Sequence, residues 1–268
     1  MLIRFGYDIA VSCAQDTPMI SMMSVRDERV EDVRKHSGFQ STPPVESSAY
    51  VDLFGNTCRR FVAPAGVFAF SCDSIIESSD APDPVEAHLG ETPVAQLPDE
   101  TVLYLLGSRY CETDRLSQLA WDMFGKLPPG WARVQAICDL VHNHIKFDYK
   151  RARATRTAYE AWEEGIGVCR DYAHLAIAFC RGMNIPARYV NGYLGDIGVP
   201  QNGPMDFSAW MEVWLGGRWH TFDPRNNQRR IGRIVVAYGR DAADVPLIHS
   251  FGPHVLQKFH IWTDEVKA

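Results

Sequence analysis

The chain has 268 residues, of which 46% are hydrophobic, and it carries a formal net charge of −6 at pH 7. This length suits one large domain or two modest ones, and the composition argues against intrinsic disorder. The negative charge also argues against surfaces that bind nucleic acid or anionic membranes, because both need clustered Lys and Arg.

Residues 1–16 alternate apolar and polar side chains, so they predict a strand and not a signal peptide. No later stretch approaches the ~18 consecutive apolar residues of a membrane span. The seven cysteines are scattered along the chain without CxxC pairs. We therefore expect reduced thiols in a cytoplasmic protein.

The first part of the chain is predicted to be rich in β-strands. Over residues 1–77, alternate apolar side chains share one face of the first strand, and Gly55-Asn56 forms a turn between two apolar runs. Residues 78–98 contain several prolines and acids without periodicity, which is typical of a linker. We therefore place a β-rich domain with its linker at 1–97 and a second domain at 98–268.

The second domain is predicted to begin with helices and to end with strands. Apolar spacings of three to four residues indicate helices around 116–123 and 134–145, and a third helix follows Cys169 and ends near Gly182. Predicted strands then cover residues 187–194, 208–215, 218–223, 233–239 and 258–262.

The segment with the most chemical content surrounds Cys169. Gly165 and Gly167 lead into it, which predicts a thiol at a helix N-terminus, where free N–H groups and the helix dipole favour a thiolate. A buried structural cysteine at a helix start would give the same spacing. The spacing alone therefore leaves both roles open.

Three separated motifs follow in a fixed order: GVCRDYAHLAIAFCRG, NIPARYVNGYL and SAWMEVWLGGRWHTFDP. Over roughly residues 100–240 this order resembles the transglutaminase-like core, and the β-rich part resembles the domain that often precedes this core in bacterial proteins. The resemblance implies a papain-like α+β fold with a cysteine–histidine–aspartate triad and without metal or cofactor. It places the nucleophile at Cys169 and the orienting acid at Asp223.

The chain departs from the family at the histidine position, which is occupied by Ser208. A triad needs an imidazole to take the thiol proton and return it to the leaving group, and a hydroxyl does not do this. If Gly216-Gly217 is a two-residue turn, His220 pairs with Val213. His220 then faces away from Ser208, because neighbouring strand residues alternate between faces.

The other histidines give no clear substitute for the missing base. His174 lies about 140° around its helix from Cys169, and His142 and His144 diverge on theirs, so they make a poor metal pair. The sequence does not place the remaining histidines relative to the sulfur, and one of them stays open as a base. These are His36, His88, His249, His254 and His260.

Two residues are candidates for binding substrate. Trp210, together with Trp219, suits the wall of an acyl-binding groove, although strand tryptophans usually belong to the core. Asp171 suits the steering of a substrate amine, although an acid in the first helical turn also favours the helix dipole. Arg188 is expected to pair with an internal carboxylate.

Two functions are consistent with these residues. In the first, Cys169 attacks a peptide or carboxamide carbonyl, forms a thioester and passes the acyl group to water or an amine, so its partner is a protein or peptide. In the second, the chain keeps the fold as a non-catalytic binding or scaffold protein, because Ser208 replaces the histidine. Exposed strand edges in the β-rich part are expected to support a homo-oligomer or substrate docking.

Overall fold

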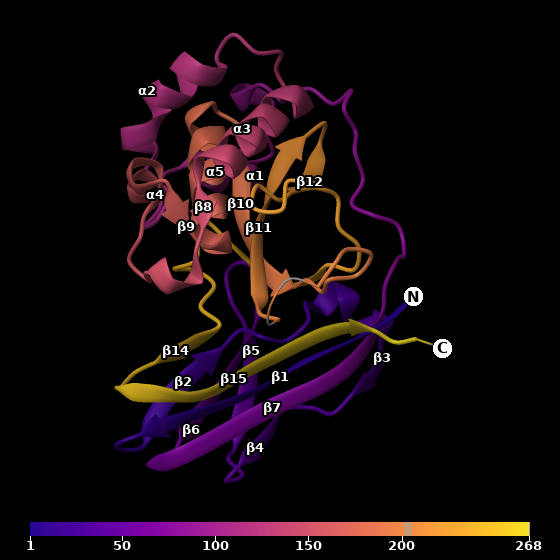
Figure 1. Cartoon of the computed structure of the whole chain (residues 1–268), viewed down its shortest axis with the longest axis vertical. Coiled ribbons are helices and arrows are strands. Elements are labelled where there is room, and N and C mark those ends of the chain that lie inside the picture. The colour runs from indigo at the N-terminus through magenta and orange to yellow at the C-terminus, as the bar shows by residue number, and fades with distance from the viewer. Residues whose placement is uncertain (202, 204, 268) are drawn as a thin grey trace.

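The computed structural model describes residues 1–201, 203 and 205–267. Figure 1 shows a lower part built of β-strands and an upper part in which helices pack on a further sheet. The helices of the upper part precede its antiparallel strands along the chain. The predicted α+β architecture with a β-rich N-terminal part is confirmed.

Two antiparallel sheets form the lower part as a sandwich. One sheet contains β15 (His254–Glu265), β1 (Leu2–Cys13), β7 (Gly66–Glu77) and β3 (Val33–His36), with β4 (Gln40–Thr42) also paired to β7. The other contains β14 (Ile248–Ser250), β2 (Thr17–Ser21), β6 (Thr57–Ala63) and β5 (Ser47–Val51). Their inner faces meet through aromatic side chains, such as Phe61 and Phe68, whose ring centroids are 5.6 Å apart.

The last strand of the chain belongs to this lower part. β15 pairs with β1 along nearly its whole length, from Ile3 opposite Glu265 to Cys13 opposite His254. Figure 1 shows the yellow C-terminal strand beside the indigo N-terminal one. The local pattern predicted a strand at 258–262 but not its partner. The proposed division at 97/98 stays a prediction, and residues 248–265 contribute strands to the lower sheets.

The upper part combines one four-stranded sheet with helices. The sheet order is β12 (Arg218–Phe222), β11 (Phe207–Leu215), β10 (Ala187–Tyr193) and β13 (Ile234–Gly239). The α-helices are α1 (Asp99–Val102), α2 (Thr113–Phe124), α3 (Trp131–His144), α4 (Ala158–Glu164) and α5 (Cys169–Gly182). Two short strands, β8 (Lys146–Phe147) and β9 (Ile166–Gly167), pair in parallel. The 3-10 helices are Asp27–Asp32, Val94–Gln96, Leu103–Leu105 and Tyr149–Arg151.

Helix α5 is the central element of the upper part. Every residue from Asp171 to Gly182 is buried, and the helix packs against α2, α3 and α4 and against β10 and β11. Such burial on all sides fixes the helix by the hydrophobic effect instead of by a single amphipathic stripe. The start of α5, where Cys169 lies, is therefore held rigidly against the sheet.

The hairpin of β11 and β12 has the predicted register. Gly216 and Gly217 both have positive φ angles, 58° and 87°, as a tight two-residue turn requires. Val213 lies opposite His220, and Leu215 lies opposite Arg218. This register fixes which face of the sheet each side chain occupies.

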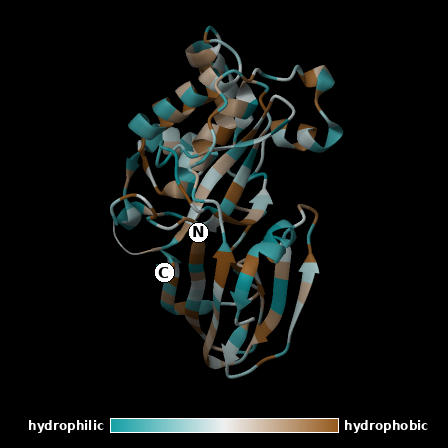
Figure 2. Cartoon of the chain, turned by 90° about the vertical axis from the view of Figure 1, so that its right-hand side faces the viewer, coloured by the Kyte–Doolittle hydropathy of each residue, from teal (hydrophilic) through white to brown (hydrophobic). Residues whose placement is uncertain are grey.

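The segment 78–98 runs along the upper part, as Figure 1 shows at the right. Its Leu89 carbonyl accepts a hydrogen bond from Trp131 N at 3.0 Å, and Glu91 pairs with Arg133 at 2.9 Å. In Figure 2, hydrophobic and hydrophilic residues alternate along strands of the lower part, as expected for sheets with one buried face. Within the described residues, no helix has the length and apolar character needed to cross a membrane.

Candidate active site

Cys169 is the first residue of α5, as predicted. Gly165 ends α4 in the left-handed conformation, with φ of 60°. At Gly167 a side chain would collide with the helix start, because a Cβ atom would lie 2.6 Å from Asp171 Cβ. The two glycines thus allow the chain to turn sharply into α5 and present the thiol at its N-terminus.

Asp171 closes this turn from inside the helix. Its side chain is fully buried, accepts a hydrogen bond from Val168 N at 2.9 Å and pairs with Arg156 at 3.1 Å. These contacts are those of a helix cap. A substrate-binding role for Asp171 stays a prediction.

Trp210, the other predicted substrate-binding residue, is fully buried on β11. Its indole lies over Gly192, where a Cβ atom would approach the ring to 2.7 Å, and the Arg233 guanidinium lies 4.8 Å from the ring centroid. The contacts of Trp210 are therefore those of a core residue. Its part in substrate binding also stays a prediction.

The pKa of the Cys169 thiol differs from the expectation for a helix N-terminus. Burial raises the pKa of Cys169 to about 11, although the backbone N–H groups of Ala209 and Arg170 and the cation of Arg225 lower it. Asp206 raises it further. At this helix N-terminus desolvation therefore outweighs the helix dipole, and the pKa of Cys169 lies above its usual value.

Ser208 lies on β11 with Cys169 at the rim of the same cavity of about 710 Å³. Its residue surface is 7% exposed, and its Oγ has no hydrogen-bond partner among the described residues. A buried hydroxyl without a partner costs free energy unless a ligand or water satisfies it. The family's histidine position is therefore polar, lies in the wall of the cavity and has no hydrogen-bond partner within the described chain.

Asp223 is occupied by other partners. Both its oxygens accept hydrogen bonds from Asn226, at 2.9 and 2.8 Å, and Arg233 pairs with it at 2.9 Å. Burial would raise the pKa of Asp223, but Arg233 and the Asn226 N–H outweigh it and hold the pKa below its usual value. The carboxylate borders a separate cavity of about 140 Å³ and not the one at Cys169.

His220 lies opposite Val213 and so on the other face of the sheet from Ser208, as the register predicted. Its Nε2 lies 3.2 Å from the Leu215 carbonyl oxygen, and its ring packs edge-on against Trp131 of α3. Burial and the nearby Arg218 lower the pKa of His220. His220 therefore serves the packing of α3 on the sheet.

Three of the remaining histidines have hydrogen-bond contacts away from the sulfur. His174 accepts a hydrogen bond from Ala242 N at 3.1 Å, and His142 Nδ1 lies 2.9 Å from the Arg225 carbonyl oxygen. His249 and His254 border a second cavity of about 880 Å³ that also reaches Cys169, but His254 is hydrogen-bonded to Ser250. The main causes of the pKa shift of Cys169 are burial, the backbone of Ala209 and Arg170, and the charges of Arg225 and Asp206.

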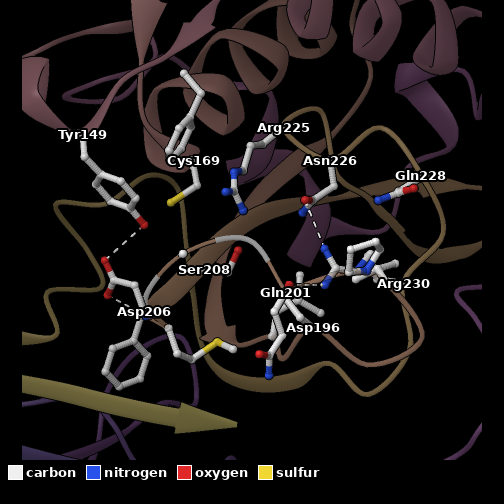
Figure 3. A pocket seen from close by; sticks show the side chains of 17 residues that line it. Tyr149, Cys169, Asp196, Gln201, Asp206, Ser208, Arg225, Asn226, Gln228 and Arg230 are labelled. Atoms are coloured by element: carbon white, nitrogen blue, oxygen red, sulfur yellow. Dashed lines mark hydrogen bonds and ion pairs between the residues drawn. The ribbon is translucent and has the colours of Figure 1, made fainter. Parts of the chain in front are cut away.

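Three residues near the sulfur were not predicted. Figure 3 shows the Cys169 sulfur between Tyr149 and Arg225, with Asp206 beside Tyr149. The Tyr149 hydroxyl donates to Asp206 Oδ2 at 3.5 Å, and Phe207 N donates to Asp206 Oδ1 at 2.6 Å. Asp206 lies just before β11 and Arg225 lies in the turn that follows β12, so strand alternation gave no signal for either residue.

Two side chains of this cluster, Asp206 and Tyr149, have raised pKa values. Burial raises the pKa of Asp206, although Phe207 N–H, Tyr149 and Arg225 partly offset this. Burial, with help from Asp206, raises the pKa of Tyr149 to about 12. Groups of perturbed pKa gathered at a cavity are typical of functional sites. Among residues 1–201, 203 and 205–267, no cluster of three His, Cys, Asp or Glu side chains could hold a metal ion.

Comparison with known proteins agrees with this geometry. Residues 117–224 match the transglutaminase-like superfamily. Rv2569c of Mycobacterium tuberculosis, an uncharacterized protein, is 31% identical over 228 residues, which cover 76% of this chain and 71% of that protein. ML0607 of Mycobacterium leprae, also uncharacterized, is 41% identical over 83 residues, or 30% of this chain and 29% of that protein.

A solved structure matches the whole chain. The crystal structure of a "Putative Cysteine Protease from Cytophaga hutchinsonii" superposes on 100% of this chain and 91% of that chain, with a TM-score of 0.89 and 29% identity. The likeness therefore includes the β-rich lower part as well as the helical core. Together with the mycobacterial relatives, these matches show that the chain belongs to the transglutaminase-like superfamily.

Proposed function

We propose that the chain is a thiol enzyme that acts on peptide or carboxamide bonds through Cys169, with Asp206 as proton acceptor in place of the family's imidazole. One observation carries the proposal: the sulfur opens into a cavity of about 710 Å³ that it shares with Asp206, Tyr149 and Arg225. This arrangement supplies a nucleophile, a base and a cation within one cavity.

The chemistry follows from the charges around the sulfur. As Sγ attacks the carbonyl carbon, its proton passes to Asp206 and a C–S bond forms. Arg225, whose guanidinium lies 4.4 Å from the Phe147 ring centroid, offers a positive charge for the developing oxyanion. Asp206 then returns the proton to the leaving nitrogen, the C–N bond breaks, and a thioester remains for water or an amine to resolve.

The raised pKa of Asp206 supports this role, because a stronger carboxylate base suits a weakly acidic thiol better. The name of the Cytophaga hutchinsonii structure also supports a thiol-dependent reaction on peptides. Whether the acyl group passes to water or to an amine depends on how the bound substrate excludes water. We place this activity in the cytoplasm, since all seven cysteines are unpaired.

Covalent trapping tests the proposal. The protein is incubated with glutamine-containing peptides and intact-mass spectrometry follows the thioester, while a parallel incubation that also contains hydroxylamine gives the hydroxamate product for quantification. Cys169→Ala should abolish both signals, and Asp206→Asn should lower hydroxamate formation about a hundredfold. The matched control is Asp80→Asn, an exposed carboxylate remote from the cavity, which should keep full activity. Equal activity of the Asp206→Asn and Asp80→Asn variants would refute the proposed base.

A second function is favoured by a different observation. Asp223 is already bound to Arg233 and Asn226, and Ser208 stands at the histidine position, so the elements of the standard triad are not assembled. In this alternative the cavity binds a peptide without turning it over. Saturable peptide binding that Cys169→Ala leaves intact, without thioester or hydroxamate in any variant, would favour it over the enzyme.

A further inference from the structure

A second cysteine lies beside a histidine in the lower part of the molecule. On β7, Cys72 and Ser74 are two residues apart and share the inner face of the strand with Phe68, Phe70 and other buried residues. β3 runs alongside, and its His36 lies directly opposite Ser74. The sheet register therefore brings a thiol, a hydroxyl and an imidazole together at one edge of the sandwich.

The distances within this group suit proton transfer. His36 Nδ1 lies 2.7 Å from Ser74 Oγ and 3.7 Å from Cys72 Sγ, and the sulfur lies 3.5 Å from Ser74 Oγ. The thiol can pass its proton to the ring directly or through the hydroxyl. In the part of the chain that the structure describes, this is the one hydrogen-bond contact between a thiol and an imidazole.

The same three side chains line a cavity of about 390 Å³. Its other walls come from both sheets and from the segment that follows β2, and they are mainly apolar. These walls include Phe5, Tyr7, Met23, Val25, Val33 and Phe39. A compact apolar molecule can thus lie between the sheets with one end at the sulfur.

The surroundings of Cys72 raise the pKa of its thiol, so its reactivity depends on the neighbouring His36. Burial raises the pKa of Cys72, and the hydrogen bond from Ser74 only partly offsets this. The adjacent Asp73 raises the pKa further and Arg59 lowers it. A protonated thiol reacts slowly unless a base takes its proton, and His36 is placed to do so.

We propose that Cys72 is a nucleophilic modification site that adds to compact apolar molecules with an activated carbon–carbon double bond, with His36 as its base. In this addition the S–H bond breaks and its proton passes to His36 Nδ1. The sulfur forms a bond to one alkene carbon while the C=C π bond breaks. His36 then returns the proton to the resulting enolate, so the step needs no oxidant or other reactant.

Site-resolved alkylation tests this assignment. The wild-type protein is treated with limiting N-phenylmaleimide or with maleimidoacetic acid, and peptide mass spectrometry gives the initial rates at Cys72 and Cys169. Each reagent is normalised to its rate with glutathione. The preference for the phenyl reagent should be about tenfold larger at Cys72, because its ring enters the apolar cavity. Equal preference at the two cysteines would overturn the apolar ligand class.

Variants test the base. His36→Gln should slow alkylation of Cys72 about tenfold or more and leave Cys169 unchanged, whereas His88→Gln, at an exposed histidine, should leave both rates unchanged. Circular dichroism checks that each variant is folded. A folded His36→Gln protein that alkylates at the wild-type rate would remove His36 from the site. If His36→Gln is unfolded, the proposal is judged by the preference of Cys72 in the wild-type protein for N-phenylmaleimide over maleimidoacetic acid. Cys169→Ala should leave Cys72 reactivity intact, so the result is independent of the proposed enzyme activity.

Discussion

The two partly exposed cysteines of this chain lie in opposite kinds of surroundings. Cys169 begins a buried helix and has backbone N–H groups, Arg225 and Asp206 around it. Cys72 lies in a strand without a helix dipole, yet has His36 within 3.7 Å. The position of a reactive cysteine and the base that activates it can therefore come from different structural features. The helix start positions Cys169, whereas the strand register places His36 beside Cys72.

The largest expected effect concerns the buried carboxylate of Asp223. Arg233→Met leaves the buried Asp223 and its neighbour Asp83 without their shared cation. We expect a loss of about 3–5 kcal/mol in the free energy of unfolding at pH 7, measured by urea denaturation. The control is Arg34→Met, which removes an exposed pair with Glu77 and should cost at most about 1 kcal/mol.

The ion pair between Asp223 and Arg233 also determines how the free energy of unfolding changes with pH. The pKa of Asp223 is lowered in the folded protein, so its stabilisation is present above the unfolded pKa and is lost as the pH falls through the folded value. Arg233→Met should remove this loss on acidification. Equal costs for Arg233→Met and Arg34→Met at pH 7 would show that Asp223 is not held by a buried ion pair.

The pH dependence of Cys169 gives the next largest effect. Because its pKa is raised to about 11, alkylation by iodoacetamide should rise about tenfold per pH unit from pH 7 to 9 without levelling. Peptide mass spectrometry at each pH measures this rate, and the urea-unfolded protein, in which the thiol has its ordinary pKa, is the control. A plateau below pH 8 would mean that an unseen group ionises the sulfur.

Ser208→His tests whether an imidazole beside Cys169 increases the reactivity of its thiol, as His36 is proposed to do for Cys72. The hydroxyl it replaces has no partner among the described residues, and Ser208 lines the large cavity, toward which a longer side chain can extend. We expect Cys169 alkylation at pH 7 to rise about tenfold, less than for a full triad because Asp223 is bound to Arg233. Ser208→Asn, which adds volume without a titratable group, is the matched variant. Similar rates in the two variants would contradict the idea that a base is what the site lacks.

Local patterns predicted much of this fold but only part of the site. Helix spacing predicted α5 with Cys169 at its start, and the Gly216-Gly217 turn predicted the register that turns His220 away. The partner of β15 could not be predicted in this way, because the pairing of Ile3 with Glu265 joins the two ends of the chain. Such long-range contacts depend on the whole fold and not on a window of sequence.

The ion pairs and pKa shifts of the site were harder to predict than its helices and strands. The resemblance implied that Asp223 orients a triad, and this role stays a prediction. In the structure its carboxylate pairs with Arg233 of a loop, which also pairs with Asp83 of the linker. Likewise, the helix N-terminus favours a thiolate at Cys169, whereas burial in the folded protein raises the pKa of the thiol. Desolvation is a property of the assembled molecule and leaves no local pattern in the sequence.

The smallest effect separates the two roles of Asp206. Its negative charge raises the pKa of Cys169, so Asp206→Asn should increase iodoacetamide alkylation at pH 7 by about twofold to fivefold. The same variant should lower hydroxamate formation, because acyl transfer also needs a proton at the leaving nitrogen. Alkylation follows the resting thiolate, which an imidazole favours by taking the proton and becoming a cation, and which the Asp206 anion opposes by its charge. Turnover instead follows proton movement during the reaction. Opposite changes in the two rates would assign both roles to Asp206, while a parallel fall would mean that the carboxylate holds the cavity in shape.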